Sequence, residues 1–422
     1  MRSPESIADH PETLLARYRT VRATSEAICA PLATDDYQLQ SITETSPPKW
    51  HLAHVSWFFE TFLLKPFDPD YRPFHPRFDY LFNSYYETVG SFHPRAQRGL
   101  LSRPTVEEIY RYRAHVDAAM QRLVLECSEG DWPALAFRLV LGLNHEEQHQ
   151  ELLYMDVKHN FAVNPLRPAY FDRAETVVSA QARRQGWVDR PGGIHPIGAS
   201  DNGFAFDNEL PRHEVLLREH RLADRLVTNG EYLEFIEDEG YGRADLWLAD
   251  GWFSLRQRGW HVPLYWEQLD GVWYEMTLSG LRPLSLAEPV CHVSYYEADA
   301  YARWAGARLP GEAELELMLA DQPLRGNFVD AGLFHPRVAM AGDGQWFGDL
   351  WEWTSTPYGA YPGFQPLEGS MGEYNGKFMC NQMVLRGGCC VTPQHHVRAS
   401  YRNFFYPHDR WAFTGIRLAR NE

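Results

Sequence analysis

Residues 132–161, WPALAFRLVLGLNHEEQHQELLYMDVKHNF, decide the fold of the N-terminal part of the chain. Apolar residues recur along this stretch at the spacing of an amphipathic helix. The stretch carries His145 and His149, and helical residues four apart lie on one face, about one turn from each other. Two imidazoles in that arrangement can share a metal ion, and Gln148 borders the same face. The alternative interpretation of such a pair is a surface or capping position.

Three further segments, residues 11–32, 49–64 and 103–130, show the same helical periodicity. We expect the second of them to begin after the Pro47-Pro48 pair, because proline suits the first turn of a helix. Four amphipathic helices predict a helix bundle, whose interior is a natural place for a metal site.

A third imidazole could come from the segment 49–64, which offers His51 and His54. Both histidines border the apolar stripe of that segment, so periodicity does not choose between them. The string HEEQH also fits the HExxH pattern of zinc proteases, in which the glutamate is the general base. The further ligand of that pattern does not follow at its usual spacing in this sequence.

A long irregular segment, residues 66–102, is rich in Pro, Tyr, Phe and Arg. Loops of this length inside a compact domain are usually functional or disordered. The aromatic content argues against disorder, so we expect functional side chains in this loop.

The sequence changes character after residue 165. Residues 166–190 predict a connector that bears Pro and Arg, and residues 191–422 predict a second domain. Short apolar bursts separated by Gly, Pro, Asp and Asn, with ten of the 14 tryptophans between Trp247 and Trp411, indicate a loop-rich α+β domain. The predicted fold class is therefore multidomain, with an α domain at residues 1–165 followed by an α+β domain.

Composition narrows the classes of partner. The formal net charge of −16 argues against nucleic acid and anionic membranes, which select basic surfaces. The first residues lack the apolar region of a secretory signal, and no apolar run approaches the length of about 18 residues that spans a bilayer. Six cysteines form no CxxC pair, so we expect a reducing, cytoplasmic location.

Several motifs together resemble the ergothioneine-pathway sulfoxide synthases. LAH at 52–54 and NHEEQHQELL at 144–153 resemble the DinB-like four-helix domain of that family. The C-terminal region resembles the C-type-lectin-like domain of formylglycine-generating enzymes, through RLPGEAELE at 308–316, GDLWEWTSTPY at 348–358, VLRGG at 384–388 and FTGIRLAR at 413–420. The likeness spans nearly the whole chain in the family's order.

The resemblance implies a cofactor, a ligand set and a reaction. It implies Fe(II) held by His54, His145 and His149, and it implies that O2 is used to join hercynine (trimethylhistidine) to a cysteine-type thiol as a sulfoxide. The thiol is cysteine or γ-glutamylcysteine, and the family branch that this chain resembles uses free cysteine. The alternatives are an ovothiol-type synthase acting on histidine, a non-catalytic metal- or ligand-binding protein and a zinc hydrolase.

The resemblance also suggests roles for residues of the aromatic loop. Tyr85 and Tyr86 are candidates for proton delivery, with packing of the loop onto the bundle as the alternative. One branch of the family carries its catalytic tyrosine in the C-terminal domain instead. Arg95 and Arg98 lie in a stretch that resembles the one holding the carboxylate of the thiol substrate, a role that suits the planar guanidinium.

Candidate contacts to hercynine lie in both domains. Gln148 would hydrogen-bond the imidazole, and Asn403, Phe404 and Phe405 match the position that binds the trimethylammonium group. Such a cation is held by aromatic faces. The actinobacterial pattern has Asn-Trp-Asp at this position, so carrying over an acidic contact is in doubt.

The C-terminal domain carries no sign of the chemistry of formylglycine-generating enzymes. Their cysteine pair falls a few residues after the Arg-Gly-Gly turn, whereas Cys389 and Cys390 follow Gly388 directly and the next segment has none. The likeness is therefore one of scaffold.

Overall fold

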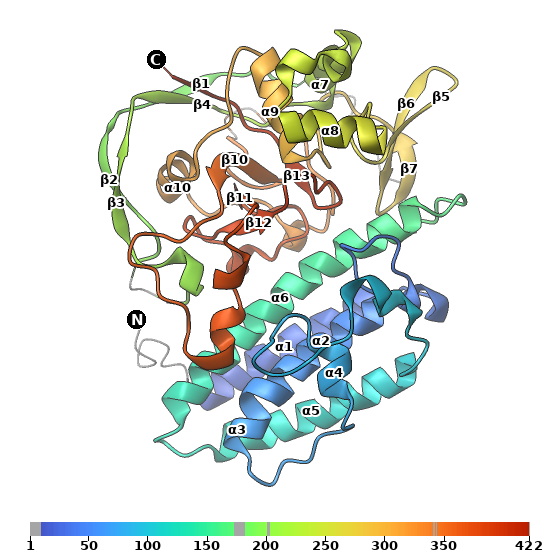
Figure 1. The fold of residues 1–422 in the computed structure, drawn as a ribbon, viewed down its shortest axis with the longest axis vertical. Helices are drawn as coiled ribbons and strands as arrows, with labels where there is room; N and C mark the ends of the chain where they lie inside the picture. Colours follow the sequence, from blue (N-terminus) through green and yellow to red (C-terminus); the bar gives the residue numbers. More distant parts are fainter. Residues whose placement is uncertain (1–9, 173–181, 201–202, 341, 343, 422) are drawn as a thin grey trace. The chain divides into compact units, whose positions relative to one another are not determined.

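The computed structural model describes residues 10–172, 182–200, 203–340, 342 and 344–421. The chain divides into two compact units (Figure 1). The first consists of Met1–Pro165, Ser200–Phe206 and Gln365–Tyr374, and the second of Leu166–Ala199, Asp207–Phe364 and Asn375–Glu422. Two short segments from the later part of the sequence therefore belong to the N-terminal unit.

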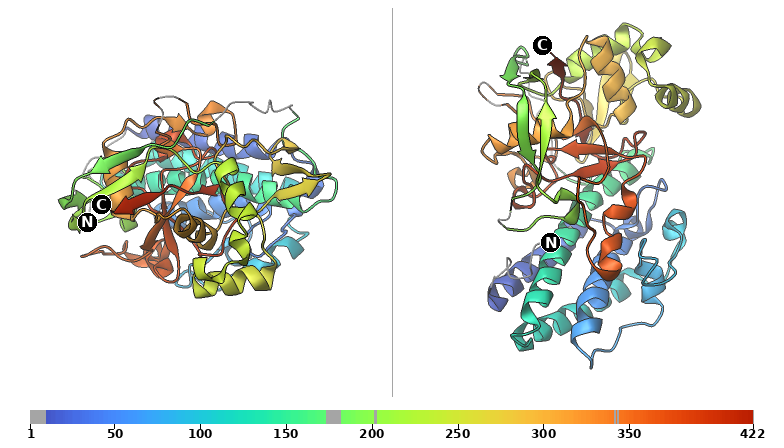
Figure 2. Two further views of the ribbon diagram at one scale, coloured as in Figure 1. Left: turned by 90° about the horizontal axis from the view of Figure 1, so that it is seen from above. Right: turned by 60° about the vertical axis from the view of Figure 1, so that its left-hand side comes forward.

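Within the described residues, four long helices build the first unit, as the sequence predicts. They are α1 (Pro11–Cys29), α2 (Pro48–Phe59), α5 (Val106–Glu126) and α6 (Trp132–Ala162). They lie side by side in Figure 1 and in the right-hand view of Figure 2. Shorter pieces complete the unit: the 3-10 turn η2 (Thr34–Gln38), the π-helical turn η3 (Glu60–Leu64), α3 (Lys65–Phe67), α4 (Phe78–Phe82) and the 3-10 turn η4 (Arg95–Leu100).

Local sequence explains where these helices begin. Helix α2 starts at Pro48 with Pro47 as its N-cap, and α6 carries Pro133 in its first turn. At the start of α5, the Thr105 hydroxyl accepts from the Glu108 N–H (3.2 Å), and the Glu108 carboxylate accepts from the Thr105 N–H (2.7 Å). These features fix the entry points of the helices that carry the histidines and of the helix beside them.

Gly142 allows helices α2 and α6 to approach closely. A Cβ at this position would lie 2.6 Å from a ring carbon of Phe59 and 3.0 Å from one of Phe58, both of which belong to α2. Real Cβ contacts are not that short, so the close approach requires glycine. His145 lies one turn further along α6, so this contact sets its distance from α2.

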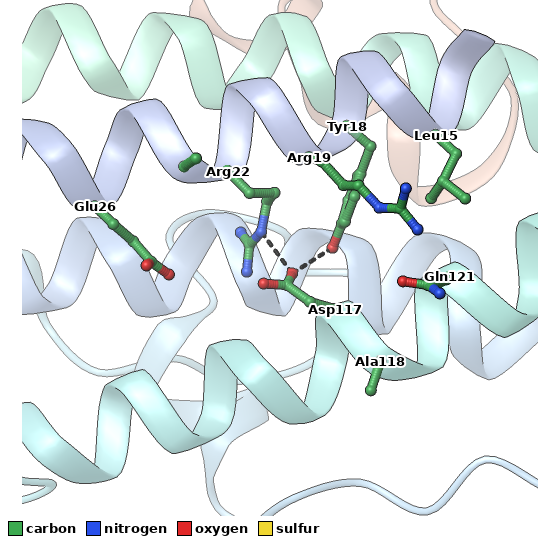
Figure 3. Close-up of a pocket in the computed structure, with 9 residues that line it drawn as sticks. Leu15, Tyr18, Arg19, Arg22, Glu26, Asp117, Ala118 and Gln121 are labelled. Carbon is green, nitrogen blue, oxygen red and sulfur yellow. Dashed lines mark hydrogen bonds and ion pairs between the residues drawn. The ribbon is translucent and has the colours of Figure 1, made fainter. Parts of the chain in front are cut away.

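Buried charges tie three of the helices together. Arg22 of α1 donates to Glu146 of α6 (3.0 Å) and to Asp117 of α5 (2.7 Å), and Arg113 of α5 also donates to Glu146 (3.2 Å). Figure 3 shows Arg22 and Tyr18 pointing at Asp117 in a cavity of about 260 Å³ between α1 and α5. Burial raises the pKa of the Glu146 carboxyl, but the two arginines outweigh burial and hold it below its usual value.

In its described residues, the second unit combines small sheets with the α-helices α7 to α10. Its four-stranded sheet has the order β12-β11-β10-β13, with β10 antiparallel to β11 and parallel to β13. The strands of the larger sheets are β1 (Trp187–Arg190), β4 (His220–Ala223) and β14 (Ala419–Asn421); β5 (Trp266–Leu269), β6 (Val272–Thr277) and β7 (Gly280–Pro283); and β10 (Trp351–Pro357), β11 (Met383–Arg386), β12 (Asn403–Phe405) and β13 (Thr414–Gly415). The other strands and the α-helices that the structure describes there are β2 (Gly193–Ile197), β3 (His213–Leu217), β8 (Gly326–Asn327), β9 (Phe347–Gly348), α7 (Asn229–Glu237), α8 (Ala249–Arg258), α9 (Tyr295–Trp304) and α10 (Glu312–Ala320).

Two buried arginines join the four C-terminal motifs in pairs. Arg386 of VLRGG donates to Glu312 (3.1 Å) and Glu316 (2.8 Å) of RLPGEAELE. Arg417 of FTGIRLAR makes two 2.7 Å bonds to Glu352 of GDLWEWTSTPY. Removing one partner of such a buried pair costs about 3–5 kcal/mol, because it leaves an uncompensated charge.

The two units match the predicted class of an α domain followed by an α+β domain. The predicted limits, 1–165, 166–190 and 191–422, stay predictions, and residues 173–181 of the connector lie outside the described part of the chain. Among the described helices, none has both the length and the apolar character to cross a bilayer.

Candidate metal centre

The structure brings the three histidines selected by the resemblance together inside the first unit. His54 comes from α2, and His145 and His149 come from α6. One ring nitrogen of each lies within 4.8 Å of the others. The ring centroids are 5.0 Å apart for His54 and His145, 4.8 Å for His54 and His149, and 4.6 Å for His145 and His149. Three nitrogen donors therefore lie close enough together to hold one metal ion.

His54 is held in a fixed orientation. Its Nδ1 lies 2.6 Å from the Phe82 carbonyl oxygen, to which it must donate. Trp50 and Trp57 both stack on its ring, with centroids at 4.6 Å and 5.5 Å and interplanar angles of 13° and 15°. The other nitrogen, Nε2, is buried and has no hydrogen-bond partner among the described residues. A lone pair held in this way is suited to a metal.

The protonation state of the trio also fits a metal. Burial lowers the pKa of all three imidazoles, to about 3 for His145, and the neighbouring histidines lower those of His54 and His149 further. The rings are therefore neutral near pH 7, as metal ligands must be. His145 Nδ1 is a second buried nitrogen without a partner among the described residues. Imidazole donors suit iron, zinc, copper and nickel.

His51, which periodicity left as an equal candidate, does not join the trio. Its Nε2 faces the Asp156 carboxylate at 2.9 Å, and its Nδ1 faces His149 Nδ1 at 2.8 Å. Both of its nitrogens are therefore engaged, and it lies behind a candidate ligand. Tertiary contacts distinguish the two histidines of α2 where spacing could not.

Glu146, the general base in the zinc-protease interpretation of HEEQH, is not available for that role. Its carboxylate accepts from Ser25 (2.6 Å) as well as from Arg22 and Arg113. A carboxylate paired with two arginines and with a lowered pKa is a poor proton acceptor. This geometry disfavours the hydrolase.

Tyr85 and Tyr86 lie in the loop that follows α4, and Tyr86 contacts Trp57, one of the two rings that stack on His54. The Tyr86 ring is fully buried, 5.5 Å from Trp57 and 5.1 Å from Phe62, and burial raises the pKa of its hydroxyl. Tyr85 stacks on Tyr86 at 4.6 Å, with the two hydroxyls 3.5 Å apart. The amide of Asn83 holds this turn by bonding both backbone groups of Tyr86. The catalytic roles of both tyrosines stay predictions.

Tyr374 is a residue of the site that the sequence analysis did not identify. It belongs to the segment Gln365–Tyr374 of the first unit. Its hydroxyl donates to the side-chain oxygen of Gln148, and its ring lies 5.6 Å from that of His145. Glu373 anchors the segment by accepting from the N–H groups of Glu87 and Thr88, both at 3.0 Å. The resemblance offered one hint of such a residue, because one branch of the family carries its catalytic tyrosine in the C-terminal domain.

The structure separates the two candidate arginines. Arg95 is exposed and donates to the backbone oxygen of Glu44. Arg98 is 3% exposed, with its guanidinium carbon 3.4 Å from the centre of the Trp50 ring and Nη1 3.0 Å from the Ser46 hydroxyl. Its Nε has no partner, and it forms no ion pair among the described residues. Burial, then Arg95, lowers the pKa of this guanidinium well below its usual value. Arg98 is therefore a buried cation in need of an anion.

Asn403, Phe404 and Phe405 form strand β12 in the second unit. Phe404 stacks on Tyr358 at 4.0 Å, whereas Phe405 packs edge-on against Trp411 at 5.3 Å. Adjacent residues of a strand point to opposite faces, so these two rings cannot line one cage together. The Asn403 side-chain oxygen accepts from the Phe404 N–H at 2.8 Å. Substrate binding by this strand stays a prediction.

Comparisons with known proteins identify the family. Residues 17–153 match the DinB superfamily model, and residues 174–322 and 340–422 match the sulfatase-modifying factor enzyme 1-like domain. The "Hercynine oxygenase" of Mycolicibacterium smegmatis is 32% identical over 98% of each chain, and that of Mycobacterium tuberculosis is 31% identical over 99% of each. The chain belongs to the hercynine oxygenase family. The "Ergothioneine biosynthesis protein 1" of Schizosaccharomyces pombe is 32% identical over 52% of this chain and 28% of that protein.

Membership in the hercynine oxygenase family confirms the resemblance drawn from the motifs. It also confirms the predicted fold class, a DinB-type helical domain followed by a domain of the sulfatase-modifying factor type. The DinB match ends within α6, which carries both histidines of the HEEQH string.

Proposed function

We propose that this protein is an iron(II)- and O2-dependent sulfoxide synthase of ergothioneine biosynthesis. It joins the sulfur of cysteine, or of γ-glutamylcysteine, to the imidazole ring of hercynine. The observation that carries the proposal is the trio of neutral imidazoles, with His54 and His145 buried and His149 half-buried, whose nitrogens lie within 4.8 Å of one another. Full-length relatives named for hercynine support the second substrate.

The reaction balances without an external reductant. One C–H bond of the imidazole and the S–H bond of the thiol break, and a C–S and an S–O bond form. The two substrates thereby lose four electrons, which is the number that one O2 accepts. One oxygen atom enters the sulfoxide and the other leaves as water.

The three imidazoles would hold Fe(II) and leave positions open on it. When bound, the ion supplies the positive charge that deprotonates the substrate thiol at neutral pH and the redox chemistry that uses O2. Because the ligands are neutral, they leave the full +2 charge to attract a thiolate. We therefore assign His54, His145 and His149 as the metal ligands in this proposal.

Arg98 is the best candidate to hold the carboxylate of the thiol substrate. It is the buried arginine of the predicted pair, and it forms no ion pair among the described residues. The stack with Trp50 places its guanidinium beside the ring that packs on His54. A carboxylate bound there would satisfy the guanidinium and keep its sulfur near the trio. Arg95, which is exposed, is the weaker candidate.

Phenols and Gln148 supply protons and orientation. Tyr85 and Tyr86 are retained as proton donors, and the raised pKa keeps the Tyr86 hydroxyl protonated. Tyr374 is added to them, because its hydroxyl bonds Gln148 next to His145. Gln148 would bond the hercynine imidazole, and Asn403 and Phe404 or Phe405 would bind its trimethylammonium group.

The test is aerobic turnover by the reconstituted protein. Protein loaded with Fe(II) without oxygen is mixed with cysteine and hercynine in air. We expect oxygen uptake and a product with the mass of both substrates plus one oxygen less two hydrogens. His54→Ala should abolish turnover, whereas His115→Ala, on α5 outside the trio, should retain it.

Other outcomes identify the alternatives. A preference for histidine over hercynine would indicate an ovothiol-type synthase, and hydrolysis with zinc alone would indicate a hydrolase. Metal binding without turnover of either substrate would contradict the proposal and leave a metal-binding protein. A parallel reaction with γ-glutamylcysteine identifies the thiol donor.

A further inference from the structure

The three candidate ligands differ in the hydrogen-bond partners of their ring nitrogens. His54 Nδ1 is backed by the Phe82 carbonyl, and His145 Nδ1 has no partner among the described residues. His149 Nδ1 faces His51 Nδ1 at 2.8 Å, and His51 Nε2 faces Asp156 Oδ2 at 2.9 Å. Among the described residues, His149 is therefore the candidate ligand that hydrogen bonds link to a carboxylate, through His51.

The arrangement fixes where the protons lie. The Asp156 carboxylate can only accept, and its Oδ2 also accepts from the Ser46 N–H at 2.8 Å. The proton of a neutral His51 ring must therefore lie on Nε2, so that His51 Nδ1 is an acceptor. His149 Nδ1 must then donate, which leaves His149 Nε2 with the free lone pair. The chain of hydrogen bonds selects the tautomer of His149 that can bind a metal through Nε2.

The pair is also held firmly in place. His51 is 2% and Asp156 is 1% exposed, so the hydrogen bonds lie in a medium where water competes little. His51 belongs to α2 and Asp156 to α6, the same two helices that carry the trio. A change in the spacing of these helices would disturb the pair and the ligands together.

We propose that His51 and Asp156 are positioning residues that orient His149 and strengthen it as a metal donor. A carboxylate that accepts through a ring raises the electron density of the ligand beyond it. A stronger donor stabilises the higher oxidation state of iron more than the lower one. The pair thereby lowers the reduction potential of the bound metal, although neither residue touches it. This inference rests on the metal-binding part of the proposed function and not on the identity of the substrates.

The test compares variants of the full chain by metal affinity and potential. Asp156→Asn removes the charge, His51→Leu removes the acceptor, and His51→Gln keeps an amide oxygen facing His149. We expect Co(II) affinity, measured against a competing chelator, to fall about 10–100-fold in the first two and less in the third. The iron midpoint potential should rise, by about 59 mV for each tenfold loss of Fe(III) over Fe(II) affinity.

A matched control separates positioning from folding. Asp117→Asn also removes a carboxylate of the same unit, which is half-buried and accepts from two buried donors, Tyr18 and Arg22. It should lower thermal stability without changing Co(II) affinity. If Asp156→Asn or His51→Leu does not fold, the His51→Gln variant decides by the same two measurements.

The proposal is overturned if folded variants bind Co(II) within about threefold of the parent and keep its midpoint potential. Wild-type protein that binds metal yet makes no sulfoxide would refute the proposed function and leave this inference intact. If the parent forms the sulfoxide but Asp156→Asn leaves metal affinity unchanged, this inference is refuted and the proposed function stands.

Discussion

Replacing Gly142 by alanine should damage the metal centre from a position that no ligand occupies. The new Cβ would lie 2.6 Å from a Phe59 ring carbon, whereas carbon atoms in good contact are about 3.5 Å apart. Helices α2 and α6 must therefore separate by something approaching 0.9 Å, unless the ring rotates away. Metal–ligand distances tolerate only about 0.2 Å. His54 on α2 would thus be pulled away from the two histidines of α6.

The substitution has two opposing effects on the free energy of unfolding. Overpacking a core costs about 1–3 kcal/mol, whereas replacing glycine by alanine inside a helix gains about 1 kcal/mol. The net loss of unfolding free energy is therefore modest, about 0–2 kcal/mol. Metal affinity should fall more steeply, by about tenfold or more, because one of three ligands is displaced.

The assay combines denaturant unfolding of the metal-free protein with Co(II) titration. Gly130→Ala is the control, since its Cβ would meet only the Ser128 hydroxyl, at 3.8 Å. Phe59→Leu combined with Gly142→Ala should recover part of the affinity by removing the ring that clashes. A Gly142→Ala variant that is more stable by about 1 kcal/mol and binds Co(II) normally would refute the reasoning, because only the helix gain would then remain.

Three further predictions concern Arg98, Tyr374 and a pair of ion-paired glutamates. Arg98→Met should lower kcat/KM for the thiol about 10–100-fold, since a hydrogen bond to a charged group contributes about 1.5–3 kcal/mol, while Arg95→Met should have little effect; steady-state kinetics decide. Tyr374→Phe should slow turnover by about 10²-fold or more without weakening Co(II) binding, and an unchanged rate would exclude the phenol from proton delivery. Burial raises the pKa values of Glu231 and Glu314, but bonds from Arg225 and Arg308 outweigh it, so both lie below their usual value. Their stabilising contribution is complete above the unfolded-state pKa and should be lost as the pH falls through the folded-state values, as acid unfolding curves of Glu314→Gln and the parent would reveal.

The helices of the first unit could be predicted from sequence because their information is local. Periodicity placed helices at 11–32, 49–64, 103–130 and 132–161, and the observed α1, α2, α5 and α6 lie within or nearly coincide with these segments. The Pro47-Pro48 pair marked the start of α2. Such signals need no knowledge of what each helix packs against.

The choice between His51 and His54 needed tertiary structure. Both border the buried face of α2, and both are buried. They differ in what faces them across the bundle, which is Asp156 for one and the open space of the trio for the other. A pattern along one helix carries no information about its neighbour, so the resemblance was required.

Tyr374 escaped prediction for a related reason. It is separated from Gln148 by 226 positions in the chain, and it lies in a segment that clusters with the helical unit. The return of this late segment to the helical unit depends on contacts between loops, such as the bonds from Thr88 to Glu373. The opposite orientations of Phe404 and Phe405 could not be predicted for a different reason. Adjacent side chains point to opposite faces only in an extended strand, and the sequence did not show that this segment is one.

Charge couples the binding of the metal ion to the binding of the thiol substrate in the proposed reaction. The neutral trio adds no negative charge to a bound divalent ion, and Arg98 contributes a further buried positive charge. Glu146 is neutralised by Arg22 and Arg113, which leaves Asp156, acting through His51, as the acid connected to the trio. A cysteine-type thiol supplies a carboxylate for the arginine and a thiolate for the ion, so it relieves both excess charges at once. Because such coupling is reciprocal, the ion and the thiol should each strengthen binding of the other.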